Sequence, residues 1–157
     1  MKILYHHRTV SRDGQDVHLT ELIHALRNRG HEVIIVSPAM HQDSEFGGTG
    51  GIIGWIKRNI PRALYEILEC SYSFVAYRQL RTAYLTHKPD ILYERYSLFL
   101  LAGKWLKSRY RIPMLLEVNA PQAEERATHD GLSLFRFARW AEATVWRSAD
   151  KVLPVTD

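Results

Sequence analysis

The apolar residues of this chain fall into short continuous runs separated by stretches with the period of a helix. Residues 3–5 and 33–36 are apolar runs, the pattern typical of parallel strands covered on both faces. Between them, apolar side chains recur at spacings of three and four residues, which predicts a helix with one buried face. These helical positions are Leu19, Leu22, Ile23 and Leu26. The first 36 residues therefore predict a strand–helix–strand unit.

The two ends of this helix carry residues that helix ends favour. Asp16 is a candidate N-cap, because its carboxylate can accept a hydrogen bond from an unpaired backbone N–H. Gly30 stands where a left-handed residue is expected after the last turn. Such a unit brings Gly14 and a helix N-terminus to the carboxyl edge of a parallel sheet, where anionic ligands bind. On this pattern alone, a purely structural unit of an α/β protein is an equally good interpretation.

The same alternation continues along the chain. A long helix is expected over residues 61–87, with Pro61 at its start. Its apolar side is expected to include Leu64, Ile67, Leu68, Val75 and Leu80. Further strands are expected at 91–93, 114–118 and 152–155, with helices over 98–110 and 132–147 between them.

This order of elements predicts an α/β fold. It is Rossmann-like and doubly wound, with a mainly parallel sheet, helices on both faces and a single domain spanning residues 1–157. Pro154 has no N–H to donate, so the last strand is expected at an edge of the sheet.

The overall composition indicates the cellular compartment and the possible partners of the protein. A single cysteine excludes an internal disulfide and fits a reducing compartment, and no apolar run is long enough for a membrane span or a signal peptide. We therefore expect a cytoplasmic protein. The net charge of +4 permits attraction to phosphate groups. No nucleic-acid-binding motif accompanies it, so nucleic acid is not an expected partner.

Several common catalytic motifs are missing from the sequence. It contains no G-x-G-x-x-G, no G-x-x-x-x-G-K-[ST] and no G-x-S-x-G, which argues against a dinucleotide enzyme, a P-loop enzyme and an α/β-hydrolase. It also has eight histidines but no H-E-x-x-H, and no metal site is expected.

Polar residues follow two of the predicted strands. Residues 91–97 read ILYERYS, and residues 115–121 read LLEVNAP before a Glu-Glu-Arg run at 124–126. Residues just past strand ends line the ligand crevice of a doubly wound sheet. The rim shared with Gly14 and Gln15 would then hold Glu94, Arg95, Asn119, Glu124 and Glu125. A solvated helix start, favoured by the helix dipole, explains Glu124 and Glu125 equally well.

Six segments together resemble the N-terminal half of a family 4 glycosyltransferase with the GT-B fold. They are MKILYHHR (1–8), GQDVHL (14–19), ELIHALRNRGHEVIIVSP (21–38), PDILY (89–93), PMLLEVN (113–119) and RSADKVLPVT (147–156). The resemblance implies an enzyme that transfers a sugar from a nucleotide-sugar to an acceptor with retention of configuration, and without a metal or other cofactor. It also implies that residues 1–157 hold the acceptor and that a donor-binding C-terminal domain is missing. The chain stops just after a strand, so we expect a fragment with no transferase activity of its own.

The resemblance also assigns roles to residues. Gly14 and Gln15 correspond to the loop that approaches the donor phosphates. Acceptor binding falls to His18, Glu94, Arg95, Tyr96, Asn119, Glu124 and Glu125. Asn119 and Arg95 stand where many members have histidine. Asn119 can orient an acceptor hydroxyl, but an amide cannot act as a general base at neutral pH.

Other interpretations stay open at this point. The acceptor could be a saccharide, a lipid-linked molecule or a small molecule. Residues 52–62 combine aliphatic, aromatic and basic side chains, which suits peripheral contact with the inner face of an anionic membrane or a helix over the acceptor cleft. A binding module without catalysis and half of a GT-B-type sugar-nucleotide epimerase are the alternative functions.

Overall fold

The computed structural model describes residues 1–8, 14–37 and 59–155, with only the backbone of 14–17. The described strands form one parallel sheet in the order β2-β1-β3-β4-β5. The strands are β1 (Lys2–His6), β2 (Glu32–Val36), β3 (Ile91–Arg95), β4 (Met114–Val118) and β5 (Lys151–Pro154). The order of the strands reverses between β1 and β3, as in a doubly wound sheet. The predicted α/β fold class is therefore confirmed.

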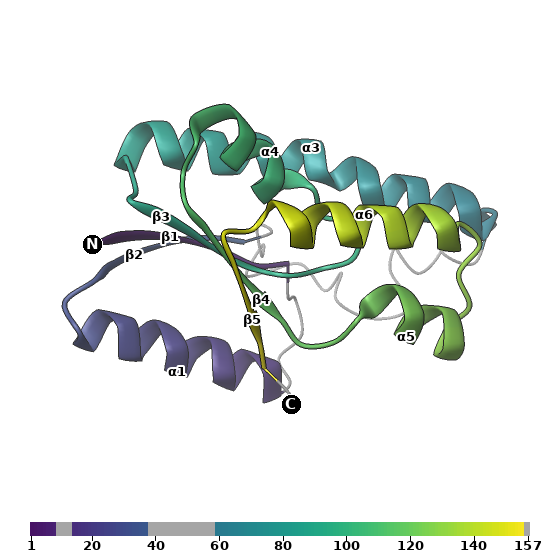
Figure 1. The fold of residues 1–157 in the computed structure, drawn as a ribbon, viewed down its shortest axis with the longest axis horizontal. Coiled ribbons are helices and arrows are strands. Elements are labelled where there is room, and N and C mark those ends of the chain that lie inside the picture. The colour runs from purple at the N-terminus through teal and green to yellow at the C-terminus, as the bar shows by residue number, and fades with distance from the viewer. Residues whose placement is uncertain (9–13, 38–58, 156–157) are drawn as a thin grey trace.

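Helices cover both faces of the sheet (Figure 1). One face carries α1 (Gly14–Asn28). The other carries α3 (Arg62–His87), α4 (Ala102–Tyr110) and α6 (Phe135–Ser148). A further short helix, α5 (Gln122–His129), lies between β4 and α6. It is missing from the predicted order, because eight mostly polar residues show no clear apolar period.

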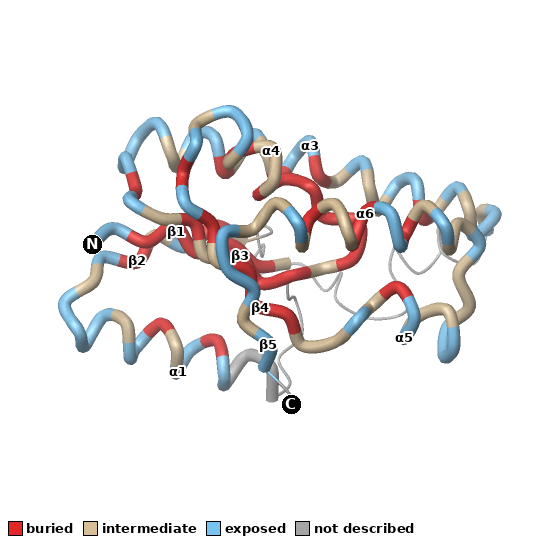
Figure 2. The backbone as a smooth tube through the Cα atoms, in the orientation of Figure 1, coloured by how far each residue is buried: buried red, intermediate tan, exposed pale blue. Residues whose placement is uncertain are grey.

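The parallel register builds two apolar layers, one on each side of the sheet. Leu4 pairs with Leu92, which pairs with Met114, and all three are fully buried on the side of α3, α4 and α6. On the side of α1, Tyr5 stacks on Tyr93 with ring centroids 5.1 Å apart. The burial is concentrated in the central strands, whereas the outer sides of the helices are exposed (Figure 2).

The predicted helix α1 is confirmed, but its start differs. Leu19 and Ile23 are buried against Tyr5, as its apolar pattern predicts. Asp16 is not the N-cap, because the helix already begins at Gly14. At the other end Gly30 has a φ of 79°, and the N–H of the next residue, His31, donates to the carbonyl of Leu26. The left-handed end at Gly30 is thus confirmed.

The helix expected over 98–110 begins later, at Ala102. Residues 98–101 are instead a buried turn, in which Phe99 has a φ of 65°. The Ser73 hydroxyl of α3 donates to the Phe99 carbonyl at 2.8 Å and accepts from the Leu101 N–H at 3.0 Å. These bonds satisfy backbone groups that a longer helix would have satisfied internally.

The apolar side predicted for α3 is wrong. Of the five residues named, only Leu80 is buried, and the exposed ones are Leu64, Ile67, Leu68 and Val75. The buried side of α3 carries Glu66, Ser73 and Ala76 instead. Small or hydrogen-bonding side chains are needed there, because the turn at 98–101 packs closely against the helix.

The two outer strands differ from each other in how well they were predicted. Ile35 of β2 is 42% exposed, so the expectation that residues 33–36 are covered on both faces is wrong at this position. The strand β5 lies at the other edge of the described sheet. The edge position predicted from Pro154 is confirmed.

Side chains from distant elements cap the helices of the α3 layer. The fully buried carboxylate of Glu66 accepts the N–H groups of Ser133 and Leu134, at 2.8 and 2.7 Å, just before α6. The Glu142 carboxylate of α6 accepts the N–H of Ala123 in the first turn of α5, at 3.2 Å. Each bond satisfies a backbone donor that a helix start leaves unpaired.

Removing the Glu66 carboxylate should destabilise the fold strongly. We expect Glu66→Ala to lower the free energy of unfolding by about 2–4 kcal/mol, because two N–H groups lose charged acceptors. Glu66→Gln keeps one acceptor oxygen, so its free energy of unfolding should lie between those of the unmodified chain and of Glu66→Ala. Urea unfolding followed by circular dichroism measures the change, with Glu124→Ala as the exposed control. A Glu66→Ala effect below about 0.5 kcal/mol would show that this cap contributes nothing.

Candidate functional site

The carboxyl ends of β1, β3 and β4 meet at one edge of the sheet, as parallel pairing requires. Tyr96 and Asn119 follow directly after β3 and β4, and Arg8 lies two residues past the end of β1. The helix α1 also begins at this edge, and Gly14 and Gln15 are its first two residues. The structure thus brings Tyr96, Asn119 and the start of α1 to one edge of the sheet. Residues 9–13 and the side chain of Gln15 lie outside the described structure, so the donor-phosphate role stays a prediction.

Glu94, a predicted acceptor residue, lies in the interior. Its Oε2 is 2.6 Å from Nδ1 of His6 on the neighbouring strand, and both side chains are almost completely buried. The carboxylate also lies against Gly103 in the first turn of α4, so closely that a Cβ there would overlap its oxygens. A helix N-terminus favours a negative charge at this place. In this structure Glu94 holds β1, β3 and α4 together.

Arg95 is directed to the opposite face of the sheet. Its Nε lies 3.5 Å from Oε1 of Glu117, and these side chains are 6% and 2% exposed. The hydroxyl of Tyr93 donates to the other oxygen of Glu117 at 3.0 Å. Burial, and then the nearby Glu117 carboxylate, raises the pKa of Tyr93, so this phenol stays protonated and remains a donor. Glu117 was not among the predicted site residues.

Tyr96 also points inward. It is 5% exposed, and its hydroxyl donates to Glu142 at 3.1 Å. Burial, followed by the Glu142 carboxylate, raises the pKa of Tyr96. The same carboxylate caps α5, so Tyr96 connects the end of β3 to α5 and α6.

The other predicted acceptor residues are accessible. His18, Glu124 and Glu125 are exposed, and Asn119 is half-buried after β4. Glu124 and Glu125 occupy the first turn of α5, where the helix dipole favours acidic side chains. Their role in binding an acceptor, like that of Asn119, stays a prediction.

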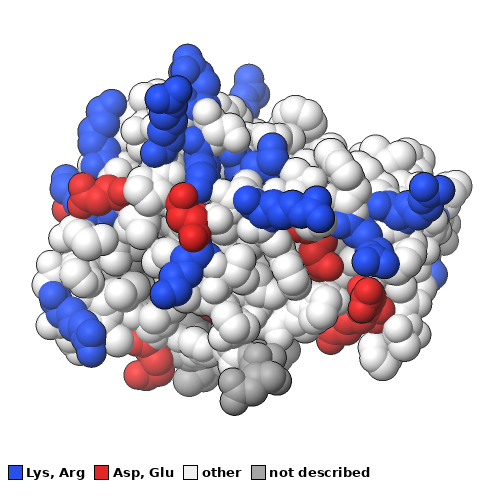
Figure 3. Space-filling model, viewed as in Figure 1, with Lys and Arg blue, Asp and Glu red and all other residues white. Residues whose placement is uncertain are grey.

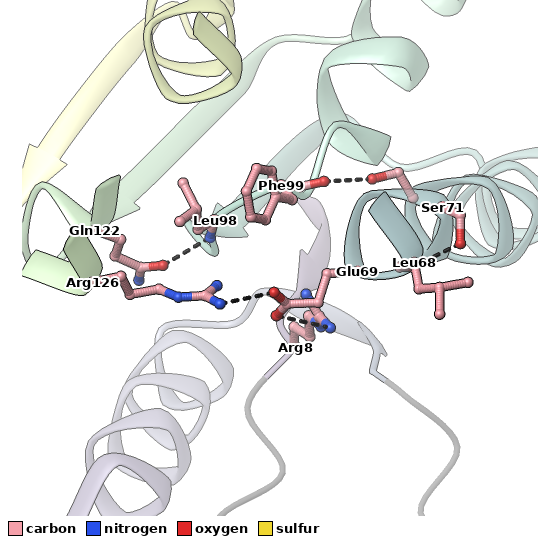
Figure 4. Close-up of polar contacts among 9 residues, drawn as sticks. Arg8, Leu68, Glu69, Ser71, Leu98, Phe99, Gln122 and Arg126 are labelled. Carbon is pink, nitrogen blue, oxygen red and sulfur yellow. Dashed lines mark hydrogen bonds and ion pairs between the residues drawn. The ribbon is translucent and has the colours of Figure 1, made fainter. Parts of the chain in front are cut away.

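A charged cluster at this edge was missed by the sequence interpretation. The Glu69 carboxylate of α3 lies 2.9 Å from Arg126 of α5 and 3.7 Å from Arg8 after β1 (Figure 4). The two guanidinium groups also lie over the rings of Phe99 and Tyr72, respectively. In the sequence Arg8 stands two residues past the first strand, but its partner lies on a helix whose position the sequence does not reveal.

A pocket of about 340 Å³ adjoins this cluster. Its walls come from the first two turns of α3, from the last turn of α5 and from the turn that leads to α6. The lining residues are Arg62, Tyr65, Glu66, Arg126, His129, Asp130 and Gly131. Arg126 thus belongs both to the pocket and to the cluster with Glu69.

Two further properties concern the described residues alone. They contain no group of three or more His, Cys, Asp or Glu side chains placed to hold a metal ion. Among the helices described, none combines the length and the apolar character needed to cross a membrane.

The contact between Glu94 and Gly103 predicts an unusual sign for a helix substitution. Gly→Ala within a helix normally stabilises by about 0.5–1 kcal/mol. We expect Gly103→Ala to destabilise instead, by more than about 2 kcal/mol, because the new methyl group displaces a buried carboxylate. Thermal unfolding gives the comparison with Gly30→Ala, where no atom lies near the added Cβ and only a positive φ is strained. Stabilisation by Gly103→Ala would refute the close contact.

Comparison with known proteins identifies a family and related folds for this chain. A family model described as a glycosyl transferase 4-like domain matches residues 13–157. Among solved structures, the spinosyn rhamnosyltransferase SpnG superposes with a TM-score of 0.57 and 19% identity, covering 100% of this chain and 48% of that one. Its complex with spinosyn aglycone gives a TM-score of 0.52 and 21% identity, covering 92% and 42%. No curated protein matches the chain.

At this level of identity the likeness is one of fold, here that of the GT-B glycosyltransferases. The chain spans about half the length of these structures. The family match extends over nearly the whole sequence and includes the described strands β2, β3, β4 and β5, but not β1. The chain therefore belongs to the glycosyl transferase 4-like domain family.

Proposed function

We propose that this chain is the acceptor-binding part of a glycosyltransferase that uses a nucleotide-sugar donor. The observation that carries the proposal is the family match over residues 13–157. Further support comes from SpnG, which has been solved with thymidine diphosphate and with its aglycone. A nucleotide and an acceptor are the two ligands that such a reaction requires.

In the proposed reaction an acceptor hydroxyl oxygen forms a bond to the anomeric carbon of the donor. The bond from that carbon to the phosphate oxygen breaks, the nucleoside diphosphate leaves with the electron pair, and the acceptor hydroxyl loses its proton. We propose that the anomeric configuration is retained and that most donor contacts come from a second domain. Neither a metal nor a resident cofactor is included in the proposal.

Two described parts of the carboxyl edge have a proposed role. The N-terminus of α1, at Gly14 and Gln15, faces the donor phosphates, because its N–H groups and dipole favour negative charge. Asn119 orients the acceptor, since its amide can donate to and accept from a hydroxyl. Because an amide does not take up a proton at neutral pH, the proton goes to another group.

We propose that the protein works in the cytoplasm and contacts the inner face of the membrane through residues 52–62. Most of that segment lies outside the described residues. The single cysteine and the mixture of apolar and basic residues in the segment are what support this setting.

Asn119 offers a direct test of the reaction. We expect the complete protein to transfer sugar from a nucleotide-sugar, and Asn119→Ala to lower kcat/KM by about tenfold or more through loss of acceptor orientation. Proton NMR of the product reports the anomeric configuration, and initial rates give kcat and KM. The matched control is Arg29→Gln, an exposed residue at the far end of α1.

Three outcomes would contradict parts of this picture. Unchanged kcat and KM in Asn119→Ala would remove Asn119 from the site. An inverted product would refute retention. No transfer from any nucleotide-sugar to a range of saccharide, lipid-linked and small-molecule acceptors would refute the activity itself.

A further inference from the structure

One wall of the pocket between α3, α5 and the turn before α6 is anchored by hydrogen bonds. Both oxygens of Glu66 are occupied by the N–H groups of Ser133 and Leu134, which anchors the turn to α3. Gly131 in this turn has a φ of 72°, and the guanidinium of Arg62 lies where its Cβ would be. The absence of a side chain at Gly131 therefore lets Arg62 approach the backbone. A backbone wall that is already anchored adds little entropy cost when a ligand binds.

The chemistry of the walls narrows the kind of ligand. Four of the seven lining residues are Arg, Asp or Glu, and both signs of charge are present. Arg62 and Arg126 only donate hydrogen bonds, whereas Asp130 when ionised only accepts them. An apolar ligand would remove water from these groups without replacing its hydrogen bonds, which is costly. A purely anionic ligand would meet Asp130 and Glu66 as like charges.

A hydroxyl-rich ligand avoids both problems. Each hydroxyl donates and accepts, so neighbouring hydroxyls of one sugar ring can bind an arginine and a carboxylate at the same time. Tyr65 adds an aromatic side chain, whose apolar faces can pack on the C–H groups of such a ring. The volume of about 340 Å³ lies within the range of small-molecule sites.

The position of the pocket connects it to the rim. Arg126 lines the pocket and lies 2.9 Å from Glu69, whose other oxygen is 3.7 Å from Arg8 at the end of β1. Along α3, Arg62 is about 10 Å from Glu69. A ligand that fills the pocket can therefore extend toward the carboxyl edge of the sheet.

We propose that this pocket binds a sugar ring of the acceptor. The identification as acceptor rests on the proposed function, but binding of a sugar ring does not. The acceptor of this chain is then a saccharide or a molecule that carries one, unlike the spinosyn aglycone bound by SpnG.

NMR titration of the ¹⁵N-labelled chain tests the proposal. The probes are methyl glycosides of glucose, galactose, mannose and rhamnose, with inorganic pyrophosphate and a macrolide aglycone as the competing chemistries. We expect at least one glycoside to shift the amide signals of Arg62, Asp130 and Gly131 in a saturable way, with a dissociation constant of roughly millimolar size. Asp130→Asn and Arg62→Gln should each weaken binding about fivefold or more.

The control variant is Arg109→Gln in the last turn of α4, a residue outside the pocket lining. Lys and Arg side chains are numerous on the face of the molecule seen in Figure 3, so a general charge effect needs such a control. This variant should bind the glycoside as the unmodified chain does. Equal weakening by Arg109→Gln would indicate a general charge effect and overturn the proposal. So would shifts with pyrophosphate alone, shifts with the aglycone alone, or no shifts at the pocket with any glycoside up to about 50 mM.

Failure of the pocket proposal can be distinguished from failure of the proposed transferase function. Glycoside binding at the pocket in a protein that transfers no sugar supports the pocket and refutes the transferase. Transfer to a saccharide with an acceptor KM unchanged by both Asp130→Asn and Arg62→Gln supports the transferase and refutes the pocket.

Discussion

The helix layer of this protein depends on hydrogen bonds in which a side chain of one helix caps the start of another. None of α3, α4, α5 and α6 is capped by the side chain of its own N-cap residue. Ser73 serves the start of α4, Glu142 serves α5, and Glu66 serves the residues leading into α6. Buried carboxylates are normally unfavourable. Here backbone N–H groups and helix dipoles compensate them, and the caps fix how the helices lie against one another.

The two edges of the sheet are built differently. At the amino edge, Asp90 accepts the N–H of Lys2 and Asp150 accepts the N–H of Met114, both at 2.7 Å. The hydrogen bond with Lys107, and then that with Met114, lowers the pKa of Asp150. These two carboxylates accept the N–H groups of the first residues of β1 and β4. At the carboxyl edge the charged groups gather around Glu69 and the pocket, so this edge keeps polar groups accessible to a ligand.

The sequence predicts the strands better than the helix faces and the site. Each strand is a short apolar run, and parallel pairing then places all carboxyl ends together. For α3, counting apolar residues fails, because the buried positions need the small Ala76 and the hydrogen-bonding Ser73. The period of two along β3 could have placed Glu94 on the buried side of Leu92. The partners of Glu66 and Glu69 could not be predicted, since they depend on how α3 packs against elements 57 or more residues away.

The Glu66 cap has a consequence for the order in which the protein folds. Its two partners lie 67 and 68 residues further along the chain, and contacts between such distant residues slow folding. We expect the start of α6 to be completed only once α3 is in place, because Glu66 supplies the acceptors for two N–H groups there. Because the same carboxylate anchors the turn beside the pocket, we expect the pocket to take its shape only when α3 and α6 have packed together.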